Sequence, residues 1–215
     1  MIISRGRRYI FIHIPKTGGT AMALALEARA MKDDLMAGDT PKARNRRGKL
    51  KEMTAAGRIW KHSTLADLDG LITAEEAEAF FTFTLVRNPW DRMVSYYHWL
   101  RAQGFDHPAV HLAKANDFSR FLTHPQTADS IGASDYGSYM RAADGTERCD
   151  AYIRLEHFER DAAPLAAHLG FDLALPRANA SKRARDYRSY YSESDAAHLA
   201  KICAKDIARF NYSFT

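Results

Sequence analysis

The feature that most constrains the fold is a short apolar run that leads directly into a glycine-containing turn and then a helical pattern. Residues 9–14 (YIFIHI) are almost continuously apolar and rich in β-branched and aromatic types. Such a run is typical of a strand buried on both faces of a parallel sheet. Pro15 and the pair Gly18-Gly19 end it, and residues 20–31 then carry Ala, Leu and Met at helical density. This segment therefore predicts a strand, a tight turn and a helix.

A second unit of the same kind follows further along the chain. Residues 81–87 (FTFTLVR) predict a strand, and Asn88 and Pro89 suit the N-cap and first position of a helix. Strands that alternate with helices predict an α/β fold, here a P-loop-like parallel β-sheet flanked by helices on both faces, in a single domain over residues 1–215. Further predicted strands are 58–62 and 151–155; further predicted helices are 73–80, 117–122, 136–141, 160–169 and 193–209.

Composition places the chain among globular proteins. Its 215 residues are 46% hydrophobic and 27% charged, and no apolar stretch approaches the roughly 20 residues of a membrane span. The first residues lack the apolar core and cleavage site of a secretory signal. Cys149 and Cys203 are too few for a disulfide scaffold and belong to no CxxC pair. We expect reduced thiols, a cytoplasmic location and no zinc site.

The net charge of +5 comes from one segment. Residues 42–51 hold six cations and no anion, and the rest of the chain carries 25 basic against 26 acidic residues. A solvated, mobile loop is one interpretation of such a run. The other is a loop that attracts an anionic substrate.

Pro15-Lys16-Thr17-Gly18-Gly19-Thr20 has the composition of a phosphate-binding loop. Glycines let the backbone turn its N–H groups inward, and the helix that follows adds its own unpaired N–H groups and dipole. The alternative is a tight connection with an exposed lysine. The loop is not the G-x-x-x-x-G-K-[ST] motif of nucleoside triphosphatases, because its lysine precedes both glycines. The strand at 81–86 ends in Arg87 and not in a carboxylate for Mg²⁺, so we expect phosphate binding by protein cations without metal.

Arg87 marks a second anion site. It follows a predicted parallel strand at its carboxyl end, where α/β proteins bind ligands, and its planar guanidinium can donate twice to one phosphate. Asn88, Arg92 and Ser95 share a helix face distinct from the apolar stripe of Trp90, Met93, Val94, Tyr97 and Leu100. Ser95 could therefore meet an oxyanion near Arg87. The alternative is that the Arg87 side chain only caps a backbone carbonyl and that Ser95 is merely an exposed residue.

These stretches resemble a known family. Residues 11–20 (FIHIPKTGGT) resemble the 5′-phosphosulfate loop of sulfotransferases that use 3′-phosphoadenosine 5′-phosphosulfate (PAPS), most closely the carbohydrate branch. Residues 85–95 (LVRNPWDRMVS) resemble that family's 3′-phosphate motif, in which Arg87 and Ser95 would hold the phosphate. Residues 179–212 resemble its C-terminal region. The resemblance leaves out 32–57 and 104–148, which we expect to be variable, acceptor-side insertions.

The resemblance implies transfer of a sulfuryl group from PAPS to a hydroxyl acceptor, with adenosine 3′,5′-bisphosphate (PAP) as product. Lys16 would stabilise the leaving phosphate. We expect a sugar or another hydroxyl compound as acceptor, no nucleic-acid partner, and a bacterial-type enzyme that lacks the membrane anchor of Golgi relatives. The two phosphate segments would hold opposite ends of one nucleotide. The alternatives are a P-loop-type kinase and a non-catalytic polyanion or nucleic-acid binder that uses residues 42–51.

The acceptor hydroxyl must lose a proton, which calls for a general base with a pKa near neutrality. The family's base, often a histidine, follows a strand between the two phosphate motifs, and His62 matches that place. His13 and His98 are more typical of packed, structural histidines, and Glu156 is a carboxylate alternative.

The basic stretch near the C-terminus completes the candidate site. Ser181, Lys182 and Arg183 could close over the nucleotide and add cations to its 3′-phosphate, or they could form a solvated loop.

Overall fold

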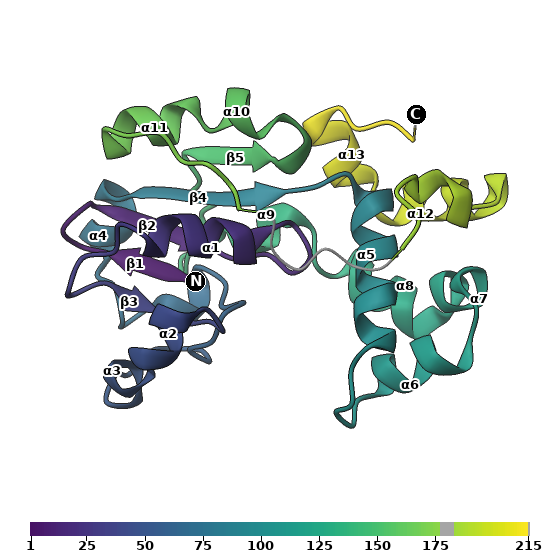
Figure 1. Cartoon of the computed structure of the whole chain (residues 1–215), viewed down its shortest axis with the longest axis horizontal. Coiled ribbons are helices and arrows are strands. Elements are labelled where there is room, and N and C mark those ends of the chain that lie inside the picture. Colours follow the sequence, from purple (N-terminus) through teal and green to yellow (C-terminus); the bar gives the residue numbers. More distant parts are fainter. Residues whose placement is uncertain (177–182, 215) are drawn as a thin grey trace. The chain divides into compact units, whose positions relative to one another are not determined.

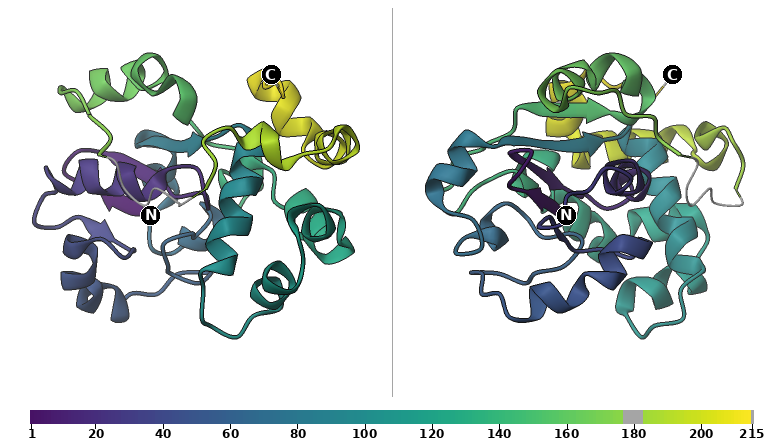
Figure 2. Two further views of the ribbon diagram at one scale, coloured as in Figure 1. Left: turned by 45° about the vertical axis from the view of Figure 1, so that its right-hand side comes forward. Right: turned by 60° about the vertical axis from the view of Figure 1, so that its left-hand side comes forward.

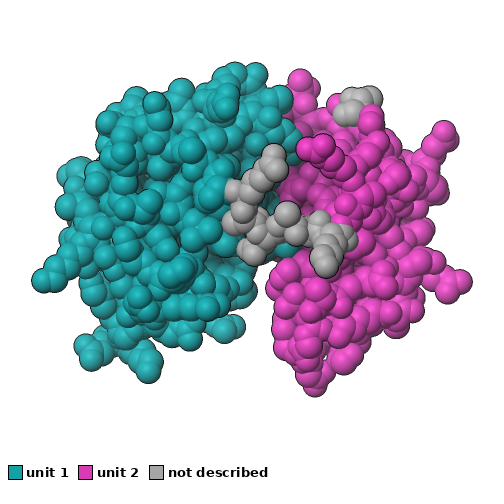
Figure 3. Space-filling view, viewed as in Figure 1, with its two compact units in different colours: residues 1–86, 136–179 teal, residues 87–135, 180–215 magenta. Residues whose placement is uncertain are grey.

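The computed structural model describes residues 1–176 and 183–214, and the chain divides into two compact units. The first comprises residues 1–86 and 136–179, and the second residues 87–135 and 180–215 (Figure 3). Each is described by itself. Among the described residues, none of the helices is both long enough and apolar enough to cross a membrane.

The first unit is built on a five-stranded mixed sheet of order β3-β1-β2-β4-β5 (Figure 1). Strands β2 (Tyr9–Ile12), β4 (Phe81–Val86) and β5 (Ala151–Arg154) are parallel, with Phe11 opposite Phe83 and Phe83 opposite Ala151. The α/β prediction is thus confirmed, and its parallel part lies in these three strands.

The remaining strands differ from the predicted all-parallel sheet. Strand β1 (Ile2–Ser4) runs antiparallel to β2, and β3 (Leu35–Met36) runs antiparallel to β1. They have only three and two residues, too few to show a strand pattern in the sequence.

The predicted strand at 58–62 is wrong, because a turn occupies this segment. The buried Ser63 hydroxyl donates to the carbonyl of Arg58 and accepts from the N–H of Trp60. A side chain therefore takes backbone groups that a strand would have paired with a neighbour.

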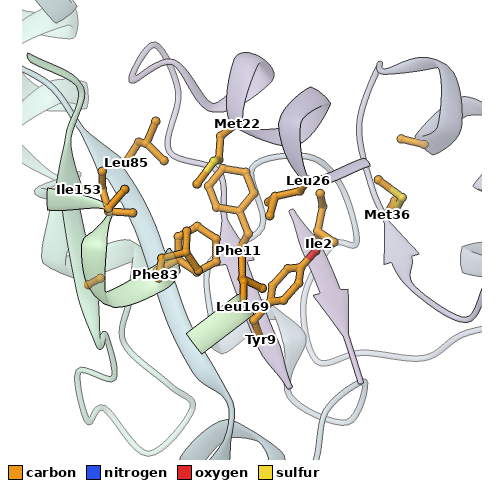
Figure 4. Close-up of a cluster of buried hydrophobic side chains, with 14 residues drawn as sticks. Ile2, Tyr9, Phe11, Met22, Leu26, Met36, Phe83, Leu85, Ile153 and Leu169 are labelled. Carbon is orange, nitrogen blue, oxygen red and sulfur yellow. The ribbon is translucent and has the colours of Figure 1, made fainter. Parts of the chain in front are cut away.

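Apolar clusters cover both faces of the sheet. On one face Met22 and Leu26 of α1 (Gly19–Glu27) pack against Phe11 and Phe83 (Figure 4). Helices α10 (Phe158–Asp161) and α11 (Ala163–Leu169) cover β5 on this side, as Figures 1 and 2 show. The other face carries the alternate strand residues, among them Ile10 and Ile12, with η1 (Ala66–Leu68), α4 (Ala74–Ala79) and α9 (Tyr136–Tyr139). Helices thus flank both faces, as predicted.

The basic segment is helical in large part. It forms α2 (Pro41–Asn45) and α3 (Arg47–Lys51), two short helices joined at Arg46.

The second unit is a helical assembly around α5 (Pro89–Arg101). Asn88 caps α5 by accepting from the N–H of Trp90, and the predicted stripe from Trp90 to Leu100 is buried. The Trp90 indole N–H donates to the carbonyl of Ala196, which fixes the C-terminal helices to α5. The predicted last helix is divided at Cys203. The other helices are α6 (Pro108–Ala115), α7 (Phe118–Thr123), α8 (Pro125–Gly132), η3 (Tyr187–Tyr190), α12 (Glu193–Ile202) and α13 (Ala204–Phe210).

Candidate active site

The loop after β2 has the backbone of an anion-binding turn. Lys16 and Gly18 both take left-handed conformations, with φ of 69° and 92°. Left-handed residues within a turn direct successive N–H groups to one side. The buried Thr17 hydroxyl donates to the carbonyl of Ile14 at 2.9 Å, which closes the turn from inside. The predicted strand–turn–helix segment is therefore confirmed.

Close packing requires glycine at two positions of this loop. A Cβ at Gly19 would lie 2.0 Å from Cδ2 of His13, and a Cβ at Gly18 would lie 2.9 Å from a methyl group of Leu155. The loop thus lies directly against the His13 ring and against Leu155, the first residue after β5.

Helix α1 begins where an anion would be stabilised. The carbonyl of Gly18 accepts from the N–H groups of Ala21 and Met22, so the helical hydrogen bonds start there. No side chain caps α1 and its first turn has no acidic residue. The N–H groups that open a helix have no intrahelical acceptor and favour an anion. The cation of Lys16 and the hydroxyl of Thr20 are on this same turn, so these residues fit a phosphate.

His62 lies beside the loop in an orientation that suits a base. Its Nδ1 is 2.7 Å from the carbonyl oxygen of His13, and the two rings meet edge to face at 4.6 Å. Because a carbonyl oxygen only accepts, Nδ1 carries the proton. The lone pair of the neutral ring is then on Nε2.

The pKa of His62 is lowered to about 4, mainly by burial and in smaller part by the nearby Lys61 cation, although the hydrogen bond to the His13 carbonyl favours the charged ring. The expected near-neutral pKa is therefore wrong for this structure. Burial likewise holds the pKa of His13 well below its usual range, with His62 as the next cause. His13 is only 7% exposed, which agrees with its interpretation as a packed histidine. Both rings are neutral at pH 7.

In the second unit one carboxylate joins two arginines. Asp91 accepts from Arg87 at 2.6 and 2.9 Å and from Arg183 at 2.5 Å. The three side chains are only 11 to 20% exposed. Arg87 thus pairs with a carboxylate, an arrangement that neither sequence interpretation anticipated. The four-residue spacing of Arg87 and Asp91 at the start of α5 could have indicated it.

Ser95 lies one helical turn after Asp91. It is 7% exposed, which contradicts the alternative that it is merely an exposed residue. Asn88 is used structurally: besides capping α5, its amide donates to the carbonyl of Ser213 at 2.9 Å.

Other candidate site residues are the basic stretch near the C-terminus and the alternative bases His98 and Glu156. Ser181 and Lys182 lie outside the described residues, whereas Arg183 is described. His98 stacks edge to face on Tyr190 at 5.1 Å, and burial and the Arg183 charge lower its pKa. Glu156 lies in the short helix η2 (Leu155–His157) that follows β5. No group of three or more His, Cys, Asp or Glu side chains that could hold a metal ion occurs in the described part of the chain.

Comparisons with known proteins identify the family and the fold. The model of the sulfotransferase family matches residues 1–213 and so spans both units. A crystal structure of mouse sulfotransferase SULT7A1 complexed with PAP has a similar fold, with a TM-score of 0.54 and 17% identity over 95% of this chain and 85% of that one. No curated protein sequence matches significantly. The chain therefore belongs to the sulfotransferase family, the family of PAPS-dependent enzymes that its two motifs resemble.

Proposed function

We propose that the enzyme transfers the sulfuryl group of PAPS to a carbohydrate hydroxyl, without a metal ion. The observation that carries the proposal is the loop at residues 15–20, an anion cradle at the start of α1 with Lys16 in it. In the reaction the bond between sulfur and the 5′-phosphate oxygen breaks, a bond from sulfur to the acceptor oxygen forms, and the hydroxyl proton leaves. The products are a sulfate ester and PAP.

The loop would bind the 5′-phosphate. The backbone N–H groups from Lys16 to Thr20 would donate to its oxygens, with the hydroxyl of Thr20 nearby. Pro15 and Thr17, whose hydroxyl is bonded to the Ile14 carbonyl, would shape the turn. Lys16 would place positive charge on the oxygen that becomes the leaving group, where charge develops as the bond breaks. Gly18 and Gly19 support this role because a side chain at either position would strike His13 or Leu155 and displace the turn.

Arg87, Ser95 and Arg183 would bind the 3′-phosphate, with Ser181 and Lys182 as further candidates. Asp91 holds the two guanidiniums together, and guanidiniums can each donate two parallel hydrogen bonds to a phosphate. At the reacting 5′ end, Lys16 and the start of α1 would supply the positive charge, which is the basis for proposing a metal-independent mechanism.

His62 would accept the acceptor's proton on Nε2. Its bond to the His13 carbonyl keeps the ring in the tautomer that a base needs. A pKa of about 4 leaves the ring fully neutral at pH 7 but weakly basic. The anionic co-substrate would raise that pKa, because a nearby negative charge favours the protonated ring.

We also propose a cytoplasmic location. Cys149 and Cys203 form no disulfide, as expected in a reducing compartment.

Calorimetric titration with PAP and turnover of PAPS test the function. Arg87→Ala should weaken PAP binding about 10- to 100-fold, the loss expected for hydrogen bonds to a charged group. Arg120→Ala removes an exposed arginine of the same unit; this control should change PAP affinity little.

Lys16→Ala should abolish transfer, and His62→Ala should lose turnover while it keeps PAP affinity. Unchanged PAP affinity in Arg87→Ala would refute the 3′-phosphate site, and turnover of ATP with Mg²⁺ in place of PAPS would indicate a kinase.

A further inference from the structure

The turn that carries His62 is closed from inside by one buried hydroxyl. Ser63 is 0% exposed. Its Oγ accepts from the N–H of Trp60 at 2.9 Å and lies 2.8 Å from the carbonyl oxygen of Arg58 and 3.0 Å from that of Trp60. A serine hydroxyl can donate one hydrogen bond and accept two. This side chain therefore satisfies backbone groups of the residues just before His62, where a neighbouring strand would otherwise have paired with them.

The chain is also fixed on either side of this turn. Before His62, the Lys61 ammonium pairs with the Asp39 carboxylate at 2.7 Å. After Ser63, the N–H of Leu65 donates to the carbonyl of Tyr139 at 2.8 Å. All of these residues belong to the first unit, so the backbone around His62 has a defined position within that unit.

The His62 ring is held at its Nδ1 and along its edges. The His13 carbonyl oxygen is 2.7 Å from Nδ1, and the rings of His13 and Trp60 contact the His62 ring edge to face, at 4.6 and 5.1 Å. Trp60 is thus bonded to the Ser63 hydroxyl through its backbone and packs on His62 through its side chain. A movement of Trp60 would reach the imidazole directly.

We propose that Ser63 is a positioning residue for the general base: its buried hydroxyl holds the turn so that His62 keeps Nδ1 on the His13 carbonyl and presents Nε2 to the acceptor. This inference rests on the proposed function. Ser63 acts through His62 and not on the substrate, because its hydroxyl is buried against the turn.

Loss of the hydroxyl would change the ring in two measurable ways. The Arg58 carbonyl and the Trp60 N–H would lose their partner, so the turn would loosen and water would reach the imidazole. Burial is the main cause that lowers the pKa of His62, so the pKa of a more hydrated ring would rise toward its ordinary value of about 6.5. A ring released from the His13 carbonyl would also exchange between its two neutral tautomers.

Ser63→Ala tests the proposal, and Thr64→Val is the matched control. Thr64 is the next residue, but its hydroxyl bonds to Asp67 in the following turn. In Ser63→Ala, kcat for transfer from PAPS should decrease about 10- to 100-fold, as expected for a misplaced catalytic group, while PAP affinity stays unchanged. The acid limb of kcat/KM should move from about pH 4 to a higher pH. Thr64→Val should leave kcat and the pH profile unchanged.

Nitrogen-15 NMR of the histidine rings gives a readout that does not depend on turnover. The His62 signals are identified by their loss in His62→Ala. At pH 7 they should show a proton on Nδ1 and none on Nε2 in the wild type and in Thr64→Val, and averaged signals of the two tautomers in Ser63→Ala. Ser63→Thr keeps the hydroxyl and should recover the wild-type signals and part of kcat.

The outcomes separate this inference from the proposed function. Wild-type kcat, acid limb and ring signals in Ser63→Ala would overturn it, as would equal losses in Thr64→Val or a Ser63→Thr variant no better than Ser63→Ala. A loss of PAP affinity in parallel with kcat would also overturn it, because it would indicate a general structural role. If the wild-type enzyme does not use PAPS, the proposed function fails, and the NMR signals still decide whether Ser63 holds His62.

Discussion

Gly19→Ala tests the packing that positions the phosphate loop. The change adds one methyl group at the first residue of α1, where a Cβ would lie 2.0 Å from Cδ2, 2.4 Å from Nε2 and 2.7 Å from Cγ of His13. The contacts are with the body of the ring, so either the imidazole or the start of the helix must move.

The ring has little room to move. His13 stacks on Phe11 with ring centres 5.9 Å apart and meets the His62 ring at 4.6 Å, while its own carbonyl is bonded to His62. Forcing one methyl group into a packed site costs about 1–3 kcal/mol. For a chain of this size, each kcal/mol lowers the melting temperature by about 2–4 °C. We therefore expect a decrease of roughly 2–12 °C in the melting temperature and weaker PAP binding, because the same shift displaces the N–H groups of the loop.

Gly48→Ala is the matched control. Gly48 lies in α3, and a Cβ there would meet no atom within 4 Å. Alanine favours a helix over glycine by about 0.5–1 kcal/mol, so this variant should be as stable as the wild type or more stable. Calorimetric melting and PAP titration compare the two. If the Gly19→Ala variant has the same melting temperature as the Gly48→Ala variant and binds PAP equally well, the close approach of His13 does not position the loop.

Three other predictions follow from particular residues. Because burial holds the pKa of His62 at about 4, kcat/KM should stay level from pH 7 to about pH 5 and fall below about pH 4 as the ring gains a proton; a decline near pH 6.5 would contradict this. His13 and His62 both have lowered pKa values, so the unfolded chain binds more protons below its pKa of about 6.5 and stability to urea should decrease as pH falls from 6.5 toward 4; a constant midpoint would argue against the burial of both rings. Asp91→Ala should lower the unfolding free energy by about 1–2 kcal/mol, since it leaves two partly buried guanidiniums without their shared carboxylate, whereas Arg188→Ala, which removes only the exposed partner of Asp186, should lower it less; equal urea denaturation curves for the two would refute this role of Asp91.

Local sequence patterns were sufficient for the elements that carry the phosphate motifs. The strand from Phe81 to Val86, the Asn88 cap with Pro89, and the turn at residues 15–18 are all present as predicted. Each of these is encoded by neighbouring residues: apolar runs, a capping side chain and glycines. The same holds for the start of the predicted helix 73–80, where Thr73 forms a capping box, and for the end of the predicted helix 160–169 at Gly170.

Predictions that required distant partners were incomplete. The segment at 58–62 has a strand-like composition, yet it forms a turn because the Ser63 hydroxyl takes its backbone groups. The preference of a short apolar segment is overridden when its hydrogen-bonding partners are decided by tertiary contacts.

The sequence by itself determined the α/β class, the strand–turn–helix segment around residues 15–20 and the helix cap at Asn88, because these depend on residue types and spacings that are local. Only the tertiary structure decided that His62 bonds to the His13 carbonyl in a buried environment and that Asp91 bridges Arg87 and Arg183. It also decided that Lys42, Arg46 and Lys49 of the basic segment donate to carbonyls of residues 27–32. The physical reason is that pKa values and ion pairs depend on burial and on charges brought together from far apart in the chain, which no local pattern records.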